Sequence, residues 1–67
     1  MSSQEFRYAL IEGATGEVWK RYVNVNKMMD DIAFKDPSCF FIGDRFTMKG
    51  YTFAQIEEMY EKGELGE

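Results

Sequence analysis

The chain has 67 residues, 45% of them hydrophobic, and a formal net charge of −4, which is the composition of one small globular domain. It contains one cysteine and no histidine, so an intrachain disulfide, a four-ligand zinc site and the commonest general base near neutral pH are excluded. No stretch approaches the ~18 apolar residues of a membrane span and no export signal is evident, which together with the free thiol predicts a cytoplasmic protein without a membrane partner. We expect a single domain over residues 1–67, with residues 1–4 and 64–67 frayed.

The N-terminal third predicts a β-hairpin. Residues 6–11 and 18–23 are rich in strand formers, and a turn containing Gly13 and Gly16 separates them. The turn lengths we consider pair even positions with odd ones, so that alternate side chains share a face. The face interpreted as core carries Phe6, Tyr8, Leu10, Trp19 and Val23, with Arg21 near an edge. The outer face carries Arg7, Ala9, Ile11, Val18, Lys20 and Tyr22.

Residues 24–34 predict an amphipathic helix. Its apolar positions recur at i, i+3, i+4 and i+7, as Val25, Met28, Met29 and Ile32. Asn24 is the candidate N-cap, with Asn26 as the alternative. The helix is expected to end before Pro37, because the residue that precedes a proline disfavours helical geometry.

A second hairpin is predicted from residues 39–42 and 45–48. Gly43-Asp44 would form its two-residue turn, since glycine in the first position suits the II′ type. In this register one face carries Cys39, Phe41, Phe46 and Met48. The other face carries Phe40, Ile42, Arg45 and Thr47.

The last element is predicted to be a helix that begins with a capping box, Thr52 to Gln55, and stops at Gly63. Its apolar stripe consists of Phe53, Ile56, Met59 and Tyr60. The element order is therefore ββαββα. We expect an α+β domain with an antiparallel sheet and both helices packed on one face.

No catalytic, cofactor-binding or metal-binding residues are expected. Cys39 opens an apolar strand, where a free cysteine behaves as a small buried hydrophobe. The acidic neighbours Asp30-Asp31 and Glu57-Glu58 diverge by ~100° around a helix, so neither pair can surround one substrate atom. No glycine run for cradling phosphate is present. The sequence therefore predicts that the protein is not an enzyme.

Two surfaces are candidates for partner binding. The outer sheet face is more apolar than a solvated face needs to be. Its predicted contact residues are Tyr22, Phe40, Ile42, Arg45, Arg7 and Lys20. The charge imbalance lies in the last eleven residues, where five glutamates are opposed only by Lys62. Four of these acids are either a contact for a basic, nucleic-acid-binding partner surface or a solubilising end: Glu57, Glu58, Glu61 and Glu64.

These features favour a non-enzymatic protein-binding regulator. In size, acidity and lack of catalytic chemistry the chain resembles the small accessory proteins with which phages and mobile elements modulate host machinery, and that resemblance implies an inhibitor of a larger enzyme. One alternative is a single-stranded nucleic-acid-binding module using Arg7, Lys20, Tyr22 and Phe40, although a charge of −4 disfavours phosphate contacts. The other alternative is a homodimeric structural element.

Overall fold

The computed structural model describes residues 6–65, and within them each of two hairpins is followed by a helix. The elements are β1 (Tyr8–Glu12), β2 (Val18–Tyr22), α1 (Val25–Ile32), β3 (Phe40–Asp44), β4 (Lys49–Tyr51) and α2 (Phe53–Glu61). The predicted ββαββα order and α+β class are confirmed. The expected fraying of residues 1–4 and 66–67 lies outside the described residues, whereas Leu65 is only 6% exposed and packs into the core.

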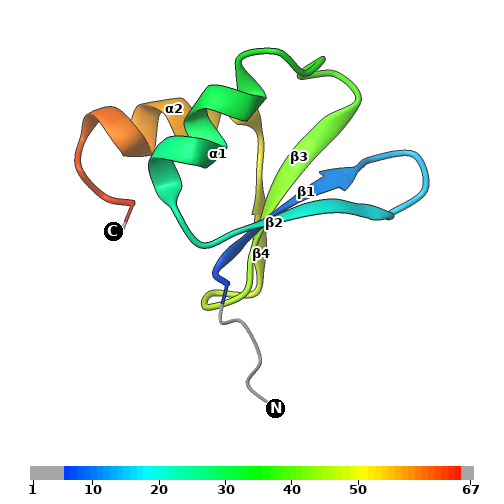
Figure 1. Cartoon of the computed structure of the whole chain (residues 1–67), viewed down its shortest axis with the longest axis horizontal. Coiled ribbons are helices and arrows are strands. Elements are labelled where there is room, and N and C mark those ends of the chain that lie inside the picture. The colour runs from blue at the N-terminus through cyan, green and yellow to red at the C-terminus, as the bar shows by residue number, and fades with distance from the viewer. Residues whose placement is uncertain (1–5, 66–67) are drawn as a thin grey trace.

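The sheet has four antiparallel strands in the order β2-β1-β3-β4. Both helices cover one face of this sheet, with α1 against β2 and α2 against β3 and β4 (Figure 1). The opposite face has no covering element in the described part of the chain. Within that part, no helix is both long enough and apolar enough to cross a bilayer.

The core lies between the helices and the covered face of the sheet. Its members are Tyr8, Leu10, Tyr22, Val25, Met28, Ile32, Ile42, Phe53, Ile56 and Leu65. Both predicted N-caps are confirmed: Asn24 Oδ1 accepts bonds from the amides of Asn26 (2.8 Å) and Lys27 (3.3 Å), and Thr52 forms the reciprocal capping box with Gln55. The caps satisfy amides that the first turn leaves without intrahelical partners, which fixes where each helix begins.

The register of the first hairpin differs from the prediction because β2 contains a bulge. Next to the turn, Ile11 pairs with Val18, an odd position with an even one as expected. The ladder then shifts, so that Leu10 pairs with Lys20 and Tyr8 with Tyr22. One extra residue in a bulge reverses the facing of every later side chain on that strand. Lys20 and Tyr22 therefore face the helices, and their predicted place on the outer face is wrong.

The residues of this hairpin that were predicted in the core differ in where the structure places them. Tyr8 and Leu10 are buried, as predicted. Trp19 contacts Phe40 on the helix side but is about half exposed. Phe6 borders the uncovered face and Val23 is largely exposed, so neither belongs to the core.

The second hairpin is longer than predicted, and its faces are inverted. Gly43 and Asp44 belong to β3 rather than to a turn, and the connection runs through residues 45–48, where Met48 has a positive φ of 61°. The Asp44 carboxylate accepts a bond from the Phe46 amide (2.9 Å), and the connection begins at Arg45, two residues later than the predicted turn at Gly43.

The longer β3 pairs with β1 in a register that places Ile42 opposite Leu10 and Phe40 opposite Glu12. Phe40 and Ile42 consequently face the helices, and their predicted position on the outer face is wrong. Phe41 points to the uncovered face instead.

Candidate protein-interaction surface

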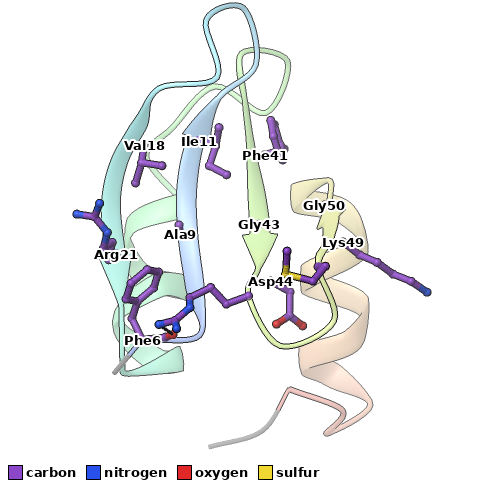
Figure 2. Close-up of a pocket in the computed structure, with 12 residues that line it drawn as sticks. Phe6, Ala9, Ile11, Val18, Arg21, Phe41, Gly43, Asp44, Lys49 and Gly50 are labelled. Atoms are coloured by element: carbon purple, nitrogen blue, oxygen red, sulfur yellow. Dashed lines mark hydrogen bonds between the residues drawn. The ribbon is translucent and has the colours of Figure 1, made fainter. Parts of the chain in front are cut away.

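The uncovered side of the sheet contains a shallow hollow of about 420 Å³ (Figure 2). Side chains and backbone from all four strands contribute to it. Its floor consists of Ala9, Ile11, Val18, Phe41, Gly43 and Gly50, and we call this set the open face. Phe6, Asp44 and Met48 also line the hollow, at its border. Val18 is 40% exposed, and every member of the open face is either apolar or glycine. A sheet face in contact with water normally presents polar side chains, so this composition makes the open face a candidate contact surface.

Two glycines make the hollow possible. Gly43 and Gly50 are paired across β3 and β4. A Cβ atom on Gly43 would lie 2.8 Å from Ile11 Cδ1, and one on Gly50 would lie 3.1 Å from the Phe41 ring. The Ile11 and Phe41 side chains therefore occupy space that side chains at the two glycine positions would fill. The result is a low apolar surface at the middle of the sheet.

Three exposed cations surround this floor: Arg21, Arg45 and Lys49, which we call the cationic rim. The guanidinium carbons of Arg21 and Arg45 lie 5.4 Å and 4.6 Å from the centre of the same Phe6 ring. Arg45 Nη1 also donates to the Phe6 carbonyl oxygen (3.1 Å). Among residues 6–65, no rim cation has a carboxylate within ion-pair distance.

Only one of the six predicted contact residues, Arg45, borders the open face. Tyr22 and Ile42 are 2% and 0% exposed in the core, and Phe40 packs against Trp19 on the helix side with ring centres 5.1 Å apart. These three were misplaced because the bulge and the longer β3 reverse their facing. Arg7 and Lys20 are held in ion pairs that the sequence did not reveal.

Arg7 forms a two-point ion pair with Asp44. Its Nε and Nη2 atoms each lie 3.0 Å from a carboxylate oxygen of Asp44, whose side chain is fully buried. Burial alone would raise the pKa of the Asp44 carboxyl, but the hydrogen bonds from Arg7 and from the Phe46 amide outweigh it and hold the pKa below its usual value. The pair joins the residue before β1 to the last residue of β3, which is a structural role.

Lys20 belongs to a second polar cluster, between β2 and α1. Asp31 Oδ2 accepts bonds from Lys20 Nζ (2.9 Å) and from the Tyr22 hydroxyl (2.8 Å). These bonds lower the pKa of Asp31, and burial together with the bond to Asp31 raises the pKa of Tyr22. The cluster fastens the first helix to the edge strand and faces away from the open face.

The four predicted acidic contact residues are all exposed and lie on or just after α2: Glu57, Glu58, Glu61 and Glu64. Glu58 pairs with Lys62 (3.4 Å) in the next turn of the helix. Because α2 lies behind the sheet in the view of Figure 2, these acids and the cationic rim belong to opposite layers. The described part of the molecule is therefore electrically two-sided.

Cys39 is exposed rather than buried, which corrects the expectation from its apolar neighbours. It precedes β3, and its Sγ lies 3.5 Å from Asp36 Oδ2. Among residues 6–65, no group of three or more potential ligand side chains is arranged to hold a metal ion.

The sequence interpretation placed Ala9, Ile11 and Val18 on the outer face and Arg45 among its contact residues, but it missed other features of this surface. It overlooked Phe41 and both glycines of the floor, and it did not assign Arg21 or Lys49 to a site. A signal was present in Gly43 and Gly50, because glycine inside strands often marks close approach of another group. The bulge that turns Arg21 outward had no such signal.

In comparisons with known proteins, the chain matches no family model, no curated protein and no solved structure. Its function is therefore inferred from the open face and the cationic rim.

Proposed function

We propose that this protein is a non-enzymatic protein-binding regulator whose contact surface is the open face. The observation that carries the proposal is an apolar floor, contributed by all four strands and uncovered by the helices, beside cations that lack partners among the described residues. A partner that covers this floor removes apolar area from water, which is favourable by roughly 25 cal/mol per Å². By occupying a functional surface of that partner, the protein would inhibit or modulate it without chemistry of its own.

The acidic residues of α2 have a different part in this proposal. They lie in the layer behind the sheet, so a partner that covers the open face does not touch them. Opposite charge on the two layers orients the molecule as it approaches a charged surface, which raises the rate of productive encounters. The same acids keep the rest of the surface soluble.

The nucleic-acid alternative is weakened by the placement of its residues. Lys20, Tyr22 and Phe40 face the helices, and Arg7 is paired with Asp44. The net charge of −4 also opposes phosphate contacts, which supply most of the affinity in such complexes.

A twofold dimer through the open face is disfavoured for another reason: it would bring two cationic rims together.

The test uses three baits: the wild-type chain, Phe41→Ser on the open face and Phe34→Ser as a matched control. Phe34 is 89% exposed after α1 and lies away from the open face. Nuclease-treated lysate of the native cells is passed over each bait, and retained proteins are purified and their affinities measured. We expect a partner that binds the wild type and the Phe34 variant but is lost from the Phe41 variant, with all three baits folded by circular dichroism. A partner held equally by the Phe41 variant would contradict the proposal.

A further inference from the structure

We propose that Arg21 and Arg45, stacked on Phe6, form an anion-binding corner that seats a carboxylate of the partner, so that the segment covering the open face is both acidic and apolar. This inference rests on the proposed function and adds the chemistry of the partner. It begins from a feature that the packing of the core does not explain, because two arginines gather on one ring at the border of an apolar floor.

The stack orients the two guanidinium groups without using up their hydrogen bonds. A guanidinium lying against an aromatic ring contacts it through its flat surface, and the N–H groups around its edge stay available. One N–H group of Arg45 donates to the Phe6 carbonyl oxygen, and this bond further restricts the position of the Arg45 side chain. A preorganised arginine loses little freedom when it binds, and its fork of donors matches the two oxygens of a carboxylate.

The charge distribution indicates that an anion is missing from this corner. The chain has more acids than bases, and among the described residues Arg7, Lys20 and Lys62 are each paired with a carboxylate, whereas Lys27 on α1 and Lys35 after it are not. Within residues 6–65 Arg21 and Arg45 also have no such partner, although both lie against the same Phe6 ring at the border of the hollow. Gathering like charges raises the free energy of the isolated protein, and an incoming anion relieves that repulsion.

The floor argues for a carboxylate on a protein rather than a phosphate on a nucleic acid. Stacking surfaces for bases need exposed rings, yet most of this floor is aliphatic side chain or glycine. The Phe6 ring already has two cations against it, which leaves Phe41 as the one other ring that lines the hollow. An acidic residue flanked by leucine, isoleucine or phenylalanine would fit both the corner and the floor.

The experiment selects ligands without assuming a partner. Random dodecapeptides displayed on phage are enriched on the immobilised wild-type chain, and the affinities of the selected peptides are then measured against variants. We expect the enriched peptides to place Asp or Glu beside apolar residues. Arg21→Gln and Arg45→Gln should each weaken binding by about ten-fold, the effect of losing one charge-assisted hydrogen bond. Lys27→Gln, an exposed charge on α1, should leave it within about two-fold.

A double-mutant cycle gives the sharpest version of this test. Changing the acidic residue of a selected peptide to Gln should weaken its binding to the wild type but add little once Arg21 or Arg45 has been replaced. Neutral or basic peptides, or equal affinity for the arginine variants, would overturn the anion-binding corner. If those peptides still depended on Phe41, the open face itself would survive as the contact surface.

The remaining possible results of these experiments distinguish the proposed acidic peptide from other ligands of the open face. Peptides that are indifferent to Phe41→Ser, or a failure to enrich any peptide, would count against the contact surface and the corner together. Oligothymidylate that binds at physiological salt and is lost from the arginine variants would show that the corner takes phosphate, which contradicts the inference. Sedimentation that reveals a dimer dissolved by Arg21→Gln would instead make a second copy of this chain the occupant and equally overturn it.

Discussion

Gly43 and Gly50 face each other across β3 and β4, and the space beside each is taken by a neighbouring side chain, Ile11 at the first and Phe41 at the second. The hollow on the open face depends on this relationship. A methyl group at either glycine would displace the neighbour outward and raise the floor.

Gly43→Ala should therefore reduce partner binding with little effect on stability. The new Cβ meets only the terminal methyl of Ile11, which can move, and alanine restricts the unfolded chain more than glycine does. We expect the free energy of unfolding to change by less than about 1 kcal/mol while affinity falls several-fold. Urea titration and binding measurements check both parts. Gly13→Ala, in the β1–β2 turn, is the control and should bind normally.

Tyr8 and Tyr22 provide a contrast between two buried hydroxyl groups. Within the described residues the Tyr8 hydroxyl has no hydrogen-bond partner, whereas the Tyr22 hydroxyl donates to Asp31. Tyr8→Phe removes an unsatisfied polar group and should leave stability unchanged or raise it by about 1 kcal/mol. Tyr22→Phe removes a bonded one and should cost about 1 kcal/mol. Equal losses in the two variants would mean that the Tyr8 hydroxyl is satisfied after all.

The ion pair between Arg7 and Asp44 predicts how stability depends on pH. Because the pKa of Asp44 is lower in the folded protein than in the unfolded chain, its contribution is present above the unfolded value of about 3.9 and is lost as the pH falls through the folded value. Stability should therefore decline in acid below about pH 4. Asp44→Asn should lose about 2 kcal/mol at neutral pH and decline less steeply in acid. Denaturant titrations between neutral and acidic pH, with exposed Asp30→Asn as control, decide the matter.

The capping box of α2 should have a measurable share in stability. Thr52→Ala removes the acceptor of the Gln55 amide bond (3.1 Å) and should cost about 1 kcal/mol. Thr52→Ser retains that acceptor and should cost much less. If the two variants melted at the same temperature, the hydroxyl bond would not stabilise the helix.

Local patterns were enough to predict the element order and both helix starts. Strand-forming runs, the 3.6-residue stripe and the caps at Asn24 and Thr52 act over a few residues, so they can be identified in the sequence. Which side of the sheet a strand presents depends on pairing between strands. The bulge at Trp19 reversed the predicted facing of the later residues of β2. The Asp44 carboxylate, which starts the second turn later than predicted, accompanies the reversed facing of the residues in β3.

This dependence on strand pairing explains why the contact residues predicted from the sequence differ from the residues that form the open face. The hydrophobic pattern alone could not decide whether Phe40 or Phe41 faces the helices, because the two residues are adjacent and both are phenylalanine. The ladder between β1 and β3 decides which of them faces the helices. The partners of Arg7 and Lys20 were also hidden, because Asp44 and Asp31 lie 37 and 11 residues away along the chain.

The most direct test of the central claim is solvent accessibility of the Ile11 and Val18 methyl groups, measured by NMR with a soluble paramagnetic agent before and after the partner is added. The open face predicts that the agent attenuates both signals in the free protein and that the partner restores them, while the Ala33 methyl after α1 stays attenuated throughout. Methyl groups that are shielded in the free protein, or that remain attenuated in the complex, would contradict the account.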